Sequence, residues 1–285
     1  MTAHTEFDFL ALPDILQTAP LNKTDRVIPI HFIKTAQFEK FTQKLSPFYQ
    51  NQIKANKWSA EDSTFTKTVS EDWECDAVYV GVEKSIGIFT ICAAAEKLPP
   101  QQYVLEASTF KPEELENACI GWLLSSYKFD HFKKNNKSAP TLIIPKKLDT
   151  TRIESTARAA YLVRNLINLP PNALGPKTLA NCVVTLAENF DAMYRITEDK
   201  ELLEENLPLI YAVGDGSDRR PCLAELAWGN PNHPHVTLVG KGVCFDTGGY
   251  DIKPSAGMLL MKKDMGGAAM AMATALMIMR AKLPI

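Results

Sequence analysis

The feature that most constrains this chain is a segment in which a short apolar run gives way to charged residues and glycines. Residues 236–239 (VTLV) are apolar or β-branched and are followed by Gly240 and Gly242, which predicts a buried strand. The charged residues that follow within 24 positions are Lys241, Asp246, Asp251, Lys253, Lys262, Lys263 and Asp264. The glycines among them predict backbone that turns sharply or approaches another group closely.

This spacing admits two interpretations. Carboxylates and lysines beyond a parallel strand lie where open α/β sheets bind their ligands. Asp246 and Asp264 are hard oxygen donors suited to a divalent cation, which activates water and polarises a carbonyl. A lysine beside them either acts as a neutral amine or stays charged and stabilises an oxyanion. The same spacing is also typical of a glycine-rich turn with solvated charges, so both interpretations stay open at this point.

The exact strings resemble a known signature. GKGVCFDTGG, IKPSAGM and MKKDMGGAA are similar to the motifs of the leucyl (cytosol) aminopeptidase family, two-metal exopeptidases that remove N-terminal residues from peptides. Looser similarity extends back to Arg158. The resemblance implies that Lys241 ligates one metal, Asp246 bridges both metals and Asp264 binds the metal that Lys241 binds. It also implies that Lys253 is the catalytic lysine, which polarises the scissile carbonyl and its oxyanion.

The resemblance further implies cofactors, substrate and assembly. Two divalent ions are expected, Zn or Mn, with Mg or Co as alternatives, and a bicarbonate in the complete enzyme. Met258 matches a family position that lines the pocket for the first side chain of the substrate, so we expect an apolar, leucine-like preference. Lys253 and Asp264 are expected to contact the substrate as well. Peptide substrates and a homo-hexamer follow from the same resemblance.

Relatives carry a further downstream motif, similar to NTDAEGR, that completes the metal sites and holds the bicarbonate. We expect residues 1–285 to stop before it, and therefore to be the first part of an aminopeptidase and inactive alone. The alternative is a catalytically incomplete fragment or non-catalytic subunit that keeps the family fold.

Composition excludes some classes of partner. A net charge of −2 and a pI near 6.2 indicate neither nucleic-acid nor anionic-lipid binding. The six cysteines are scattered singly, and the first 18 residues lack the pattern of an export signal, so we expect a cytoplasmic protein. The apolar run 265–279 is shorter than the roughly 20 residues of a membrane span and predicts a core helix.

Patterning along the chain predicts an α/β fold with two domains. We expect an N-terminal mixed α/β domain over 1–149 and a catalytic domain over 150–285, with a mostly parallel sheet and helices on both faces. Predicted strands are 26–33, 77–82, 85–92, 141–144, 194–196, 221–228 and 236–239. Predicted helices are 35–45, 112–127, 151–168, 176–189, 200–206 and 265–279. Residues 211–217 and the segment with His233 and His235 are predicted turns.

Overall fold

The computed structural model describes the chain except for residues 1–7, 12–14, 18–25, 107–109, 135–137 and 146–147. Of residues 1–18, whose sequence lacks the pattern of an export signal, the structure describes 8–11 and 15–17. The chain forms two compact units, Leu12–Ala157 and Arg158–Ile285, and the second also includes the described residues 8–11. The predicted domain boundary at 149/150 stays a prediction.

The first unit is built on a six-stranded sheet in the order β1-β6-β5-β2-β4-β3. Four neighbouring pairs are parallel, and only β3 and β4 are antiparallel. The strands are β1 (Leu16–Gln17), β2 (Val27–Lys34), β3 (Phe65–Val69), β4 (Cys75–Val82), β5 (Gln102–Glu106) and β6 (Thr141–Ile143). The mixed α/β class with a mostly parallel sheet is thus confirmed.

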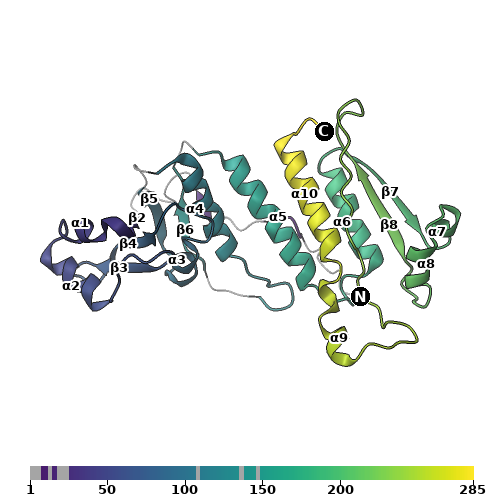
Figure 1. Cartoon of the computed structure of the whole chain (residues 1–285), viewed down its shortest axis with the longest axis horizontal. Coiled ribbons are helices and arrows are strands. Elements are labelled where there is room, and N and C mark those ends of the chain that lie inside the picture. Colours follow the sequence, from purple (N-terminus) through teal and green to yellow (C-terminus); the bar gives the residue numbers. More distant parts are fainter. Residues whose placement is uncertain (1–7, 12–14, 18–25, 107–109, 135–137, 146–147) are drawn as a thin grey trace. The chain divides into compact units, whose positions relative to one another are not determined.

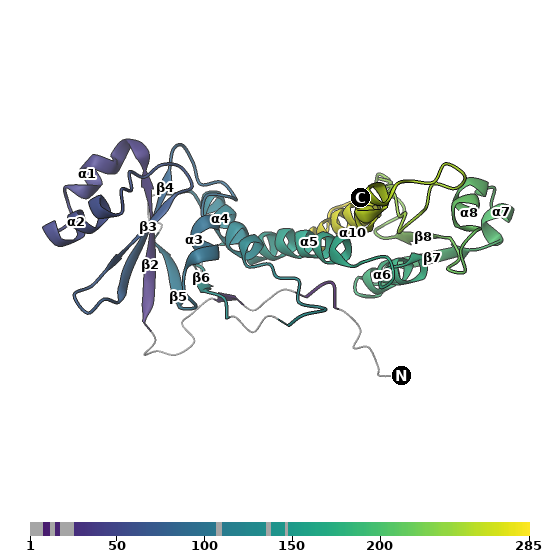
Figure 2. The ribbon, with the colours of Figure 1, turned by 90° about the horizontal axis from the view of Figure 1, so that it is seen from below.

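Helices cover both faces of this sheet, because successive side chains of β4 point to opposite faces and both sets are apolar. Val78 and Val80 are fully buried in the larger core, and Ala77 and Tyr79 belong to a second core. The larger core lies beneath α3 (Cys92–Lys97), α4 (Pro112–Ser125) and the start of α5 (Thr150–Asn168). The second lies beneath α1 (Phe38–Thr42), which directly follows η1 (Thr35–Gln37), and α2 (Pro47–Ala55); Figures 1 and 2 show α1 and α2 on the side of the sheet opposite to α3 and α4.

The predicted strand 85–92 is wrong. The Gly87 N–H bonds the Thr90 hydroxyl at 3.0 Å, which closes a turn, and α3 begins at Cys92. The backbone of Ile86 is bonded by α4 side chains in place of a neighbouring strand: its N–H by Glu114 at 3.1 Å and its carbonyl by Asn117 at 3.2 Å. The apolar residues are buried by α4 packing over the turn, which periodicity alone does not distinguish from a strand.

The second unit contains the remainder of α5, α6 (Pro176–Glu188), β7 (Met193–Glu198), α7 (Glu201–Glu204), α8 (Pro208–Gly214), β8 (Cys222–Ala227), α9 (Ser255–Leu259), η2 (Met261–Lys263) and α10 (Gly266–Ala281). Its paired strands within the described residues, β7 and β8, are antiparallel. The mostly parallel sheet therefore belongs to the first unit, and the parallel pairing predicted for 150–285 is not seen between β7 and β8.

Two local predictions in this unit are also wrong. Residues 236–239 form no strand, since no described strand is paired with this segment, and Val239 is 90% exposed. The turn predicted over 211–217 is wrong in its first part, since Pro208 begins helix α8, which extends to Gly214. Its second part is observed, because the Ser217 N–H donates to the Gly214 carbonyl at 3.1 Å and closes a turn. By contrast, His235 lies in the predicted turn and its Nε2 is 2.9 Å from the Pro231 carbonyl oxygen.

The predicted core helix 265–279 is confirmed as α10. Its buried residues, Ala269, Met272, Ala273, Leu276 and Met279, recur at helical spacing. Gly266 lies against Ile167 of α5, since a Cβ there would be 3.4 Å from the Ile167 Cδ1. No helix among the described residues is long and apolar enough to cross a membrane.

Candidate active site

Two glycine-bearing segments cross at the start of α10 and position the first candidate lysine. The Ala268 N–H donates to the Lys241 carbonyl at 2.8 Å. A Cβ on Gly240 would lie 2.5 Å from the Gly267 carbonyl oxygen, and one on Gly267 would lie 2.8 Å from the Lys241 nitrogen. Both distances are too short for a side chain, so the crossing requires glycine at both positions. The crossing places Lys241 beside Asp264, which lies two positions before the start of α10.

Asp264 accepts from two ammonium groups. Lys241 Nζ lies 2.9 Å from one carboxylate oxygen, and Lys263 Nζ lies 3.2 Å from the other. The hydrogen bond from Lys241, with that from Lys263, lowers the pKa of Asp264 below its ordinary value, although desolvation opposes the shift. The carboxylate therefore stays ionised and is available as a hard anionic donor.

A second pair joins the loop before α9. Lys253 Nζ donates to the Asp246 carboxylate at 2.5 Å, and the Gly248 N–H donates to the same oxygen at 2.8 Å. The hydrogen bond from Lys253 is the main reason that the pKa of Asp246 is lowered, and the nearby Asp264 carboxylate acts in the opposite direction. Gly248 has a φ of +88°, which closes the loop so that Lys253 returns to Asp246.

The structure thus brings Lys241, Asp246, Lys253 and Asp264 into one region of the second unit. Met258 is half-buried on α9, directly after the loop that carries Lys253. Sequence reasoning missed two neighbours. Met261 is buried, and its sulfur lies 3.5 Å from Lys253 Nζ. The sequence shows Lys263 as a charge next to Asp264 but indicates no role for it, and an apolar residue such as Met261 gives no signal of a site.

The donor set fits the metals expected from the sequence in part. Two ionised carboxylates and an amine are suitable in kind for a divalent cation. Among the described residues, however, no three His, Cys, Asp or Glu side chains are grouped closely enough to hold a metal. Asp246 and Asp264 therefore fit as part of a ligand set, and the lysine ammonium groups supply the positive charge around them.

Comparisons with known proteins agree with this fold. Residues 161–285 match the catalytic domain of the cytosol aminopeptidase family, and residues 28–145 match the N-terminal domain of M17 aminopeptidases. The chain belongs to the cytosol aminopeptidase family, as the sequence resemblance predicted.

Individual relatives give the extent of the similarity. The chain is 43% identical over 159 residues to Peptidase B of Pectobacterium atrosepticum, covering 52% of this chain and 36% of that protein. The crystal structure of the cytosol aminopeptidase of Coxiella burnetii is similar with a TM-score of 0.87 and 35% identity, over 96% of this chain and 59% of the other. The bottromycin maturation enzyme BotP in complex with Mn shares the fold at a TM-score of 0.74 and 24% identity, over 90% of this chain and 57% of BotP. The chain thus spans less than two thirds of the length of these relatives.

Proposed function

We propose that this protein is a metal-dependent aminopeptidase that releases N-terminal residues, preferably apolar and leucine-like, from peptides. The observation that carries the proposal is the gathering of Lys241 with Asp264 and of Lys253 with Asp246 in a chain of the cytosol aminopeptidase family. Two divalent ions would supply water activation and polarisation of the scissile carbonyl. Zn and Mn are the leading candidates, with Mg or Co as alternatives, and BotP, which shares the fold, was solved with Mn.

Each residue has a proposed role. Asp246 and Asp264 would hold the cations as ionised carboxylates, and Lys241 would do so as a neutral amine, once its ammonium group has released a proton to solvent. Lys253 presents a positive charge to the developing oxyanion of the substrate, and Met258 contacts the first side chain. A bicarbonate, a homo-hexameric assembly and a cytoplasmic location are further parts of the proposal, supported by family membership.

Lys253 provides the direct test. If its charge stabilises the oxyanion, Lys253→Ala lowers kcat by about a hundredfold or more and leaves KM nearly unchanged. The assay is hydrolysis of leucine p-nitroanilide by the protein as its gene encodes it, with Mn²⁺ or Zn²⁺ supplied. Lys177→Ala, which removes an exposed lysine at the start of α6, is the matched control. A normal kcat in Lys253→Ala contradicts the assigned role.

A second candidate is a family member that keeps the fold without turnover. It is favoured by the observation that only two carboxylates gather among the described site residues. Calorimetric titration with Mn²⁺ and the hydrolysis assay together separate the two candidates. If the protein is an enzyme, it binds Mn²⁺, hydrolyses the substrate and loses most of its metal affinity in Asp246→Asn. If it is the non-catalytic alternative, the folded protein shows no hydrolysis at saturating metal.

A further inference from the structure

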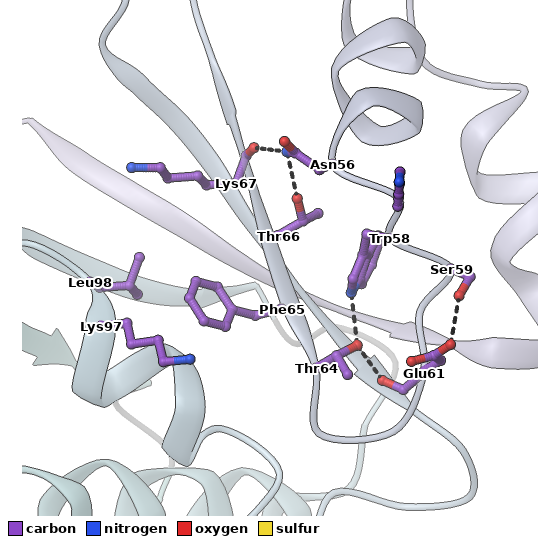
Figure 3. Close-up of a pocket in the computed structure, with 11 residues that line it drawn as sticks. Asn56, Trp58, Ser59, Glu61, Thr64, Phe65, Thr66, Lys67, Lys97 and Leu98 are labelled. Atoms are coloured by element: carbon purple, nitrogen blue, oxygen red, sulfur yellow. Dashed lines mark hydrogen bonds between the residues drawn. The ribbon is translucent and has the colours of Figure 1, made fainter.

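A groove in the first unit lies outside the site described above. It consists of two adjoining cavities of ≈ 420 and ≈ 440 Å³ that share Lys67 of β3. One wall is β3, which contributes Phe65, Lys67 and Val69, and the other is the segment from the end of α3 to β5, which contributes Leu98 and Pro99. Figure 3 shows the Phe65 and Lys67 side chains on the side of β3 where Leu98 and Lys97 lie. The groove therefore follows one strand for its whole length.

The backbone of β3 is partly open along this groove. β3 is the last strand of its sheet and pairs only with β4 among the described strands. Alternate residues of an antiparallel strand bond the same neighbour. Since the carbonyl of Thr64 accepts from Gly81 at 2.8 Å, the backbone groups of Phe65 and Lys67 point away from β4. An open edge of this kind accepts an added strand.

The edge is closed at one end by side chains. The amide of Gln52 bonds both the N–H of Val69, at 2.8 Å, and its carbonyl, at 2.9 Å. The Asn56 amide lies 3.4 Å from the Lys67 carbonyl. The open part is therefore confined to Phe65 and the Lys67 N–H, which suits a short segment and not an extended sheet-to-sheet contact.

Charge and apolar surface in the groove identify the kind of ligand. Lys57, Lys67 and Lys97 line the first cavity, and no ion-pair partner is present for their ammonium groups in the described part of the chain. The opposing carboxylate there is that of Glu61, which accepts from the Ser59 hydroxyl at 3.3 Å. Phe65 and Leu98 add apolar surface, and Trp73, 86% exposed, lines the second cavity.

We propose that the groove along β3 binds a short, extended acidic peptide, with its backbone added to the open edge and its carboxylates paired with the three lysines. In an alternating acidic and apolar sequence the acidic side chains all point to one face of the added strand, because side chains of an extended peptide alternate in direction, and this is the face on which Lys67 and Lys97 lie beside Phe65 and Leu98. Nucleic acid is disfavoured, because its backbone has no N–H groups to donate to the open edge of β3.

The test uses the whole chain and acetyl-Glu-Val-Glu-Val-Glu-amide, whose blocked N-terminus prevents it from being an aminopeptidase substrate. Calorimetry should detect binding that weakens with added salt. Lys67→Glu should weaken it by about tenfold or more, as expected for loss of a charge-assisted hydrogen bond and addition of a repulsive charge. Lys40→Glu, an equal charge change on α1 outside the groove, should leave the affinity unchanged. Trp73 should shift its emission to shorter wavelength on binding, and Trp73→Phe should remove that shift.

Two further measurements keep the proposal falsifiable. The same peptide methylated at every backbone nitrogen retains its charges and should bind much more weakly, since it cannot donate to β3. If Lys67→Glu fails to fold by circular dichroism, Lys97→Glu and Lys67→Gln replace it, with the same direction expected. Equal affinity for the wild type and for the folded groove variants overturns the proposal. So does tighter binding of single-stranded oligothymidylate, or no measurable binding of the acidic peptide.

Discussion

Similar apolar runs differ in burial between the two units. Val78 and Val80 of β4 are fully buried, whereas Val239, in the run predicted as a strand, is 90% exposed. β4 has β2 on one side and β3 on the other, and cores on both faces. Residues 236–239 have no paired strand among the described residues. An apolar, β-branched run therefore becomes a buried strand only when neighbouring strands bond its backbone and other side chains pack over its faces.

The buried side of this comparison predicts the largest effect. Trp122 is fully buried in the first unit, and its Nε1 donates to the Pro140 carbonyl at 3.1 Å. Trp122→Ala should destabilise this unit by about 3–5 kcal/mol, because it leaves a large cavity and an unpaired carbonyl. Urea unfolding, with the transition of each unit fitted separately, measures the change. Phe89→Ala, which truncates a ring that is 74% exposed, should stay within about 0.5 kcal/mol of wild type.

A pair of identical substitutions tests the comparison directly. Val80→Ala should cost about 2 kcal/mol, since two buried methyl groups are lost. Val239→Ala removes the same atoms from an exposed position and should change the free energy of unfolding by less than about 0.5 kcal/mol. The same urea experiment applies. If Val239→Ala costs as much as Val80→Ala, residues 236–239 are covered in solution and the difference between the units disappears.

Thiol reactivity sharpens the comparison in a different way, because each unit contains a deeply buried cysteine. Burial raises the pKa of Cys119 and of Cys182 to about 12 from an ordinary value of 9.0. At pH 8 both thiolate fractions are therefore about a thousandfold smaller than in the unfolded chain, and alkylation by iodoacetamide should be correspondingly slow. Mass spectrometry after timed labelling, with a urea-unfolded control, measures both sites.

The same pKa shifts set a pH dependence. Between pH 9 and 12 the unfolded chain has lost thiol protons that the folded chain retains, so stability falls as the pH rises through this window.

Fast labelling of Cys182 with slow labelling of Cys119 would show that the second unit opens more readily. Equally slow labelling of the two cysteines would show that the interior of the second unit around α6 is as well protected from the reagent as the interior of the first unit.

Much of the helical structure followed from the sequence. The helix predicted over 176–189 is observed as Pro176–Glu188, and the one over 151–168 as Thr150–Asn168. In both, apolar residues recur at helical spacing and a proline marks an end: Pro176 begins the first, and Pro170 follows the second. These signals are local, so they need no knowledge of the remainder of the fold.

The strands predicted over 26–33, 77–82, 141–144, 194–196 and 221–228 are observed as β2, β4, β6, β7 and β8. By contrast, β3, β5 and the turn at 85–92 were not predicted, because their burial depends on distant partners. Ile86 is buried by α4, whose side chains also bond its backbone, and nothing within residues 85–92 indicates this. The five residues of β3 also give no indication that its edge is open, since this depends on the sheet order and on Gln52.

For the candidate site, the sequence by itself determined the residue types, their order and the family: Lys241, Asp246, Lys253 and Asp264 stand in motifs dense enough to indicate an aminopeptidase. Tertiary structure decided which ones meet. Lys241 and Asp264 are separated by 23 positions and pair because glycines at 240 and 267 let two backbones cross. Met261 reaches Lys253 only through the fold of η2. Chemical identity is local information, whereas contact between distant positions depends on the packing of the whole unit.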